Sequence, residues 1–369
     1  MGLQDHYKPS LLQEISQDLT VEPCEQKLFE EAQAYLDSLT KPRGSLGRLE
    51  ELARRLFAIR HGQRPLRVSP AIMYTIAGDH GVAQKNVSAY PQAVTRQMVA
   101  NFLQGGGAIN VLSSEVCMTL CLVDAGCAGG PFEPHPLLLS RRLGEGTDDI
   151  SEGPAMSREK ALEALRYGVE LAREAAFDGC QCLGMGEMGI ANTTPATALF
   201  SAYLDLDVER ITGPGTGISK AQMAQKMAVI SQALQVNAKH LQGDAIDILA
   251  ALGGFEIAMM SGLVLGSAAE RLPILVDGFI ATSAYLVARA IEPRVRDYAI
   301  LSHASAEPGY ALILEKLAER PLLALDMRLG EGTGCALAYP LLKAASAIFN
   351  DMATFESAGV MGASTRDER

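Results

Sequence analysis

The 369-residue sequence contains no CxxC pair, no low-complexity tract and no long uninterrupted apolar run. Its seven cysteines lie mostly within apolar segments, and no histidine is spaced with a cysteine pair as zinc sites require, so we expect reduced thiols and no metal site. The segment MGLQDHYKPS has no signal-peptide core. The most apolar stretch, residues 272–290, is interrupted by Asp277 and Gly278 and predicts a strand, a turn and a helix. These absences predict a cytoplasmic protein without a membrane segment.

Basic residues are fewer than acidic residues, 32 against 43, which gives a formal net charge of -11. An acidic surface repels phosphate backbones, so we expect no nucleic-acid partner. Hydrophobic residues make up 48% of the chain and charged residues 20%, which is typical of a folded globular protein. This length can form one large domain with an appendage or two domains.

A repeated pattern predicts the fold class. Short apolar runs end in glycine and a polar residue, and helical patterns such as residues 158–176 follow them. Uninterrupted apolar strands indicate burial on both faces, and their alternation with helices predicts an α/β fold with a parallel sheet. The expected strands lie at 71–81, 116–126, 180–189, 273–278, 298–305 and 322–332, with a weaker one at 208–217.

The two ends of the chain differ from its centre. Residues 39–60 predict a Pro/Gly loop followed by an amphipathic helix capped near Ser45, and residues 336–357 also look helical. We therefore expect a small helical domain from residues 1–60 and 336–369. The large α/β domain, with the active site, would span residues 61–335.

Polar residues follow the predicted strands where each one ends. Ligands of open α/β sheets bind outside the carboxyl ends of the strands, so a site built from these loops is the better interpretation. The residues concerned are Asp79, His80, Asp124, Glu187, Asp277, Ser302, Ser305 and Glu331.

Two glycine-rich segments could bind phosphate. GMGEMG (184–189) matches the dinucleotide pattern GxGxxG, with Asp205 about 20 residues further on, and would suit an NAD(P)-dependent oxidoreductase. A carboxylate at Glu187 would repel a pyrophosphate, so the glycine amides could instead hold a single phosphate. GPGTGISK (213–220), with Lys226 beyond it, has the amide density of an anion site and is equally consistent with a tight turn.

The motif LGEGT occurs twice, at 143–147 and 329–333. Only the second copy follows a strong predicted strand, LLALDM, which makes Glu331 the better candidate for a general base. The neighbouring Met327 and Leu329 would raise its pKa toward neutrality. Glu145, in the first copy, is expected to be a solvated loop acid.

These segments together resemble the nicotinate-nucleotide:dimethylbenzimidazole phosphoribosyltransferase family. The resemblance implies a Rossmann-like parallel sheet flanked by helices, a homodimer and no cofactor. It also implies transfer of the 5-phosphoribosyl group from nicotinate mononucleotide to 5,6-dimethylbenzimidazole or a similar base, in cobalamin nucleotide-loop assembly. A non-catalytic nucleotide sensor stays open as a third hypothesis. The segments that carry the resemblance are KPRGSLGRLEELA (41–53), AGDHGVAQKNVSAYPQAVTRQMVANFLQGGGAINVLS, GMGEMGIANTTPATAL, GPGTGISK, LGGFEIAMMSGLVLGSA, PILVDGF, SHASAEPGY, LDMRLGEGTG and MATFESAGV (352–360).

The same resemblance assigns roles to individual residues, with Glu331 as the catalytic base. It places the aromatic base near Asp79, His80, Tyr90, Pro91, Gln97, Met98, Met327 and Leu329. It places the nucleotide and its phosphate near Glu187, Met188, Gly189, Asn192, Thr193, Thr194, Gly215, Thr216, Gly217, Lys226, Asp277 and Ser305. The chain departs from the family pattern where Ala191 replaces a usual glycine, Pro214 an arginine of GRGTG, and Ala304 a larger residue.

Overall fold

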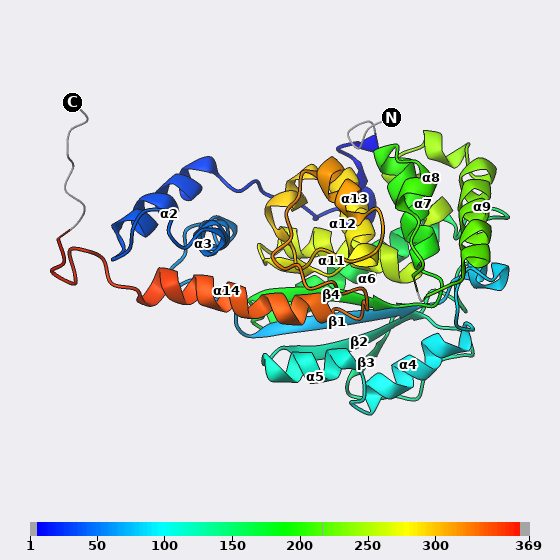
Figure 1. Cartoon of the computed structure of the whole chain (residues 1–369), viewed down its shortest axis with the longest axis horizontal. Helices are drawn as coiled ribbons and strands as arrows, with labels where there is room; N and C mark the ends of the chain where they lie inside the picture. The colour runs from blue at the N-terminus through cyan, green and yellow to red at the C-terminus, as the bar shows by residue number, and fades with distance from the viewer. Residues whose placement is uncertain (1–5, 216, 362–369) are drawn as a thin grey trace.

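The computed structural model describes residues 6–215 and 217–361. Within these residues, six strands form one parallel sheet in the order β3-β2-β1-β4-β5-β6 (Figure 1). The order reverses between β1 and β4, so the switch point at which open α/β sheets bind ligands lies between these two strands. The strands are β1 (Ala71–Gly78), β2 (Thr119–Gly126), β3 (Leu138–Ser140), β4 (Cys182–Met188), β5 (Ile274–Val276) and β6 (Ala299–Leu301).

Helices cover both faces of the sheet. Figure 1 shows α6, α11 and α12 on one side of the strands and α4 and α5 on the other. The α-helices are α1 (Leu11–Ile15), α2 (Gln26–Ser38), α3 (Arg48–Ile59), α4 (Ala93–Leu103), α5 (Ala108–Glu115), α6 (Arg158–Phe177), α7 (Thr193–Leu204), α8 (Val208–Ile211), α9 (Lys220–Val236), α10 (Ala245–Leu252), α11 (Phe255–Ala269), α12 (Phe279–Ile291), α13 (Tyr310–Leu317) and α14 (Thr333–Asp351). Short 3-10 helices lie at Gly81–Lys85, His240–Gln242 and Pro293–Asp297. The predicted α/β fold with a parallel sheet is therefore confirmed.

Alternate residues of the central strand enter two different apolar layers. Tyr74 and Ile76 belong to the core that includes α6, α7 and α10 to α12. Met73, next to Tyr74 in the strand, belongs to the core formed with α5 and α14. Burial on both faces explains why β1 and β4 are apolar without alternation.

Two predicted strands are wrong. Residues 322–332 leave the sheet after a single bridge between Leu323 and His303, and the side chains of Leu325 and Leu329 are 52% and 59% exposed. Leu322 and Leu323 pack partly buried against the core formed with α5 and α14, and the residues after them have no sheet face to occupy. Residues 208–217 begin with the short helix α8, whose first turn is capped by the Asp207 side chain. Strand β3 was not expected from the sequence.

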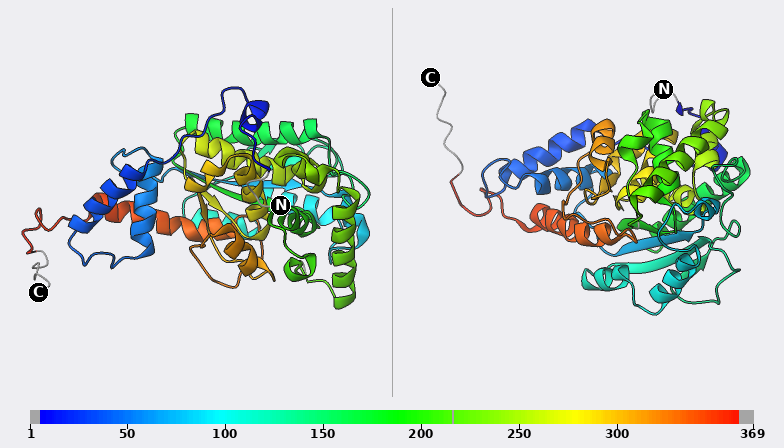
Figure 2. Two further views of the ribbon diagram at one scale, coloured as in Figure 1. Left: turned by 90° about the horizontal axis from the view of Figure 1, so that it is seen from above. Right: turned by 45° about the vertical axis from the view of Figure 1, so that its right-hand side comes forward.

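The terminal helices meet at one end of the molecule. Leu36 of α2, Phe57 of α3 and Phe349 of α14 share one apolar core, and Figures 1 and 2 show the three helices side by side. Helix α3 begins at Arg48 with Gly47 before it, so the predicted cap at Ser45 is wrong. No side chain caps α3, and the Glu50 carboxylate accepts the Leu46 N–H of the preceding loop at 2.9 Å.

The remaining N-terminal segment packs elsewhere. Leu11, Leu12 and Ile15 of α1 enter the core on the α6 side of the sheet. The first half of α14 also packs on the sheet, through Cys335 and Ala338. Among the described residues, no helix is both long and apolar enough to cross a membrane.

Candidate active site

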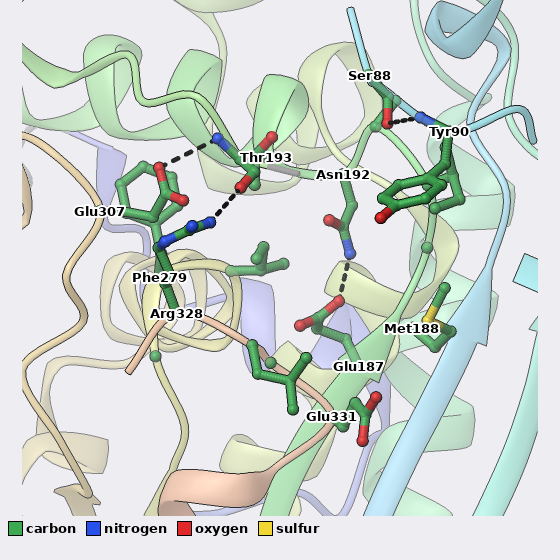
Figure 3. Close-up of a pocket in the computed structure, with 18 of the residues that line it drawn as sticks. Ser88, Tyr90, Glu187, Met188, Asn192, Thr193, Phe279, Glu307, Arg328 and Glu331 are labelled. Carbon is green, nitrogen blue, oxygen red and sulfur yellow. Dashed lines mark hydrogen bonds between the residues drawn. The ribbon is translucent and has the colours of Figure 1, made fainter. Parts of the chain in front are cut away.

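A cavity of about 490 Å³ opens at the carboxyl ends of β1 and β4, where the strand order reverses (Figure 3). Its walls come from segments far apart in the sequence: residues 87–98, 187–193, 278–280, 303–307 and 328–331, together with Gly215. The predicted position of a site at this edge is therefore matched by a cavity.

The loop that carries Glu331 is bent sharply onto β4. Gly330, Glu331 and Gly332 have φ values of 87°, 64° and 95°, a left-handed run that costs free energy at the glutamate. The Glu331 N–H donates to the Glu187 carbonyl at 3.2 Å, and Thr75 Oγ1 donates to the Glu331 carbonyl at 2.7 Å. These bonds to β4 and β1 hold the strained residue in place.

The Glu331 carboxyl group is buried at the start of a helix. It is 5% exposed, and its Oε2 accepts the Ile109 N–H at 3.2 Å in the first turn of α5. Burial raises the pKa of Glu331, while the backbone N–H groups of Ile109 and Ala108 lower it, and burial prevails. A carboxylate with a raised pKa is a suitable proton acceptor near neutral pH.

The first LGEGT copy has a different environment. The Glu145 carboxylate accepts the N–H groups of Gly129 at 2.7 Å and Gly130 at 2.9 Å, and it pairs with Arg142 at 2.6 Å. The two backbone bonds lower its pKa. Glu145 is the solvated loop acid that we expected, with its side chain 61% exposed, and it also anchors the glycine turn at 129–130. It does not line the cavity.

Glu187 lines the centre of the cavity. Burial raises its pKa to about 8, and the charges of Asp277, Glu256 and Glu331 act in the same direction. The Asn192 side-chain amide donates to Glu187 Oε2 and partly opposes that shift. Glu187 is therefore largely a neutral acid at pH 7 and can donate a hydrogen bond to a ligand.

The side of the cavity formed by the start of α7 and Gly215 has the features of an anion site. Thr193 is the first residue of α7, where the aligned peptide dipoles of the helix place a partial positive charge. Behind it, the fully buried Lys226 Nζ donates to Thr193 Oγ1 at 2.7 Å and to the Gly213 carbonyl at 3.0 Å. Burial lowers the pKa of Lys226 to about 8.

The glycines of GMGEMG do not form a dinucleotide turn. Gly184 and Gly186 lie inside β4, and α7 begins only at Thr193. At Gly186 a Cβ atom would lie 2.1 Å from the Gly332 nitrogen, so this glycine allows the close approach of the Glu331 loop. The dinucleotide hypothesis therefore has no support in the local geometry.

Most residues singled out from the sequence reach the cavity. Those that line it are Glu331, Tyr90, Met98, Leu329, Glu187, Met188, Gly189, Asn192, Thr193, Gly215 and Ser305. Those that lie outside its lining are Asp79, His80, Pro91, Gln97, Met327, Thr194, Gly217, Lys226 and Asp277. Thr216 falls outside the described residues.

The residues outside the lining have other contacts. Asp277 accepts the N–H groups of Gly332 and Gly334, each at 2.9 Å, and so fixes the turn into α14; burial raises its pKa to about 7. His80 pairs with Glu256 at 2.7 Å in the interior. Asp79 and Gln97 line a separate hollow beside α4.

Sequence reasoning missed several lining residues, among them Ser88, Phe279, Glu307 and Arg328. Glu307 and Arg328 stand in segments, SHASAEPGY and LDMRLGEGTG, that follow or include predicted strands. Charge in a strand-end loop was the available signal for both. Among the described residues, no group of three or more His, Cys, Asp or Glu side chains is arranged to hold a metal ion.

Comparisons with known proteins identify the family of the chain. A family model described as phosphoribosyltransferase matches residues 21–360. The nicotinate-nucleotide--dimethylbenzimidazole phosphoribosyltransferase of Solidesulfovibrio magneticus is 58% identical over 92% of this chain and 96% of its own length. The protein of the same name from Nitratidesulfovibrio vulgaris is 57% identical over 92% of this chain and 96% of its own length.

A solved structure shows the same fold. The crystal structure of CobT from Thermus thermophilus has a TM-score of 0.87 and 42% sequence identity, and the match covers 91% of this chain and 100% of that one. Nothing among these relatives supports an oxidoreductase. The chain belongs to the nicotinate-nucleotide--dimethylbenzimidazole phosphoribosyltransferase family.

Proposed function

We propose that this protein transfers the 5-phosphoribosyl group of nicotinate mononucleotide to 5,6-dimethylbenzimidazole or a similar base. The products would be alpha-ribazole 5'-phosphate and nicotinate, for cobalamin nucleotide-loop assembly. The observation that carries this proposal is the buried Glu331 carboxyl group, which lines a cavity with an apolar end and an anion-binding side. The names of the similar proteins support the same reaction.

The apolar end suits a flat aromatic acceptor. Met98 and Met188, with Tyr90 and Leu329 at the rim, form polarizable walls that can accept several ring shapes. One ring nitrogen attacks the anomeric carbon, and Glu331 removes the proton from the other nitrogen. The pyridine ring of the donor is already a cation, so it leaves without a general acid. Attack from the opposite face inverts a β-nucleotide into an α-linked product.

The anion side suits the donor phosphate. We assign it to the N-terminus of α7, with Thr193 and Gly215 at the surface and the Lys226 charge behind them. Glu187, held by Asn192, would then face the ribose as a neutral hydrogen-bond donor. The protein's main contribution is to position the reactants and to stabilise the positively charged transition state.

The direct test is incubation with nicotinate mononucleotide and dimethylbenzimidazole, scored for nicotinate release. Absence of release would remove the transferase proposal, and nucleotide binding without turnover would favour a sensor. A competition among benzimidazoles, purines and phenols would then identify the preferred base.

We also infer a cytoplasmic homodimer, and we narrow the small helical domain expected from residues 1–60 and 336–369 to α2, α3 and the second half of α14, since α1 and the first half of α14 pack against the large domain. The support for the location is that all seven cysteines are free thiols, as in reducing compartments. The core shared by α2, α3 and α14 supports the helical domain. The dimer rests on the family resemblance, and its test is the mass in solution.

A further inference from the structure

The cavity contains a guanidinium group without a carboxylate partner. Arg328 is the only arginine or lysine among the described residues that line the cavity. Among the described residues, its one side-chain hydrogen bond joins Nη1 to the Gly215 carbonyl at 3.0 Å, and no acidic residue of this set forms an ion pair with it. A guanidinium has five N–H donors, so most of its capacity is free for a ligand.

The position of Arg328 separates it from the acceptor end. Figure 3 shows Arg328 and Glu307 at the end of the cavity opposite Tyr90, with Glu187 between the two ends. Arg328 also lies three residues before Glu331 in the same loop. A ligand bound by the guanidinium is therefore held by the segment that carries the proposed base.

The donor brings two anionic groups into a cavity that is already acidic. Three carboxyl groups, those of Glu187, Glu307 and Glu331, line the walls. The phosphate has its own cradle at Thr193 and the buried Lys226, which leaves the carboxylate of the pyridine ring without a counter-charge. A carboxylate taken from water into this cavity without a cationic partner would lose its hydration uncompensated.

We propose that Arg328 binds the pyridine carboxylate of the donor and thereby selects nicotinate mononucleotide over its amide. The planar guanidinium fork matches a carboxylate with two parallel hydrogen bonds, whereas a neutral carboxamide presents only one acceptor and no charge. The same contact stabilises the nicotinate anion as it leaves. This inference rests on the proposed transferase function and names the residue that sets its donor specificity.

The test compares kcat/KM for three donors: nicotinate mononucleotide, nicotinamide mononucleotide and nicotinate riboside, which lacks the phosphate. In Arg328→Gln we expect the preference for the acid over the amide to fall by roughly 10- to 100-fold, because a charge-assisted hydrogen bond is lost. The preference for the phosphorylated donor over the riboside should change much less, because Arg328 contacts the phosphate side only through its bond to the Gly215 carbonyl. Arg328→Lys keeps the charge without the planar fork, so its preference for the acid over the amide should lie between those of the wild type and Arg328→Gln.

Two further variants separate a role of Arg328 in carboxylate binding from a role in phosphate binding. Lys226→Met should reduce the phosphate preference and leave the acid preference intact, and Arg320→Gln, an exposed arginine outside the cavity, should change neither. An unchanged acid-to-amide ratio in Arg328→Gln, or a loss confined to the phosphate preference, would overturn the proposal. If the wild-type protein releases no nicotinate from any donor, the proposed function itself fails.

Calorimetric binding of free nicotinate and nicotinamide provides a readout without turnover. The wild-type protein should bind nicotinate more tightly, and Arg328→Gln should bind both ligands equally. Thermal unfolding of each variant shows that it is folded. Equal nicotinate affinity in the folded wild type and variant would contradict the role of Arg328.

Discussion

Glu331 combines a strained backbone with a buried carboxyl group that has a raised pKa. Glu331→Gln keeps the size of the side chain and removes its ability to accept a proton. We expect kcat to fall by roughly 10²- to 10⁴-fold, the usual contribution of a general base, with donor binding retained. Steady-state kinetics and a donor binding titration would check this. The wild-type rate should also fall as the pH drops through the raised pKa, and near-normal turnover in the variant would show that another group is the base.

A second residue-scale prediction concerns Ala191, a residue with a side chain at a position where the backbone is left-handed. The structure gives Ala191 a φ of 76°, in the left-handed region that glycine adopts freely. Ala191→Gly should therefore raise the free energy of unfolding by about 0.5–1 kcal/mol, since relief of strain exceeds the added chain entropy. Urea unfolding measures this. Ala198→Gly, within α7, is the matched control and should lower stability by about 1 kcal/mol; equal effects of the two changes would contradict the strain argument.

At the scale of elements, the Glu331 loop depends on the absence of a side chain in β4. In Gly186→Ala the new Cβ would meet backbone atoms of Glu331 and Gly332 at 2.1–2.4 Å, so the loop must move. We expect loss of most activity together with about 1–3 kcal/mol of stability, as in other overpacked sites. Kinetics and denaturant unfolding would show both. Gly153→Ala, with open space around its Cβ and no positive φ, should leave both unchanged.

The sequence predicted strands correctly where apolar residues are buried because the sheet is covered on both faces. The runs that became β1 and β4 are apolar because both faces of the sheet are covered, and the sequence pattern reports that directly. Residues 322–332 are apolar for other reasons, because Leu322 and Leu323 pack against the core outside the sheet and Leu329 lines a cavity. Sequence pattern does not distinguish a side chain facing the core from one facing a ligand. Glu331 was found, but the strand expected before it was not.

Site residues could be predicted where a local sequence signal marks them and were missed where the contact between distant loops decides their role. Glu187 follows a predicted strand and was expected at the site from that position, whereas Thr193 was expected there from the family resemblance. Arg328 and Phe279 were missed because their role depends on which loops meet across the sheet. That meeting is set by the strand order, in which β1 neighbours β4, and strand order is not readable from local patterns.

At the scale of the whole molecule, the buried acids should make stability depend on pH. Burial raises the pKa of Glu187 to about 8 and that of Asp277 to about 7, whereas in the unfolded chain both ionise near their ordinary values of 4.5 and 3.8. Between these limits the folded state binds more protons than the unfolded state. The stabilisation from each group is therefore complete below about pH 4 and is lost as the pH rises through its folded pKa.

Glu187→Gln isolates one of these groups, because glutamine can still accept the Asn192 bond and carries no proton equilibrium. Measured by urea unfolding from about pH 5.5 to 9, the wild-type protein should lose stability relative to this variant as the pH approaches about 8. Glu145→Gln is the control. The pKa of Glu145 is lowered, so its contribution is lost only as the pH falls below the ordinary range of a glutamate, and its curve should run parallel to the wild type in this window. Parallel curves for Glu187→Gln as well would mean that Glu187 is already ionised in the folded protein, and its assignment as a neutral hydrogen-bond donor to the ribose would then be withdrawn.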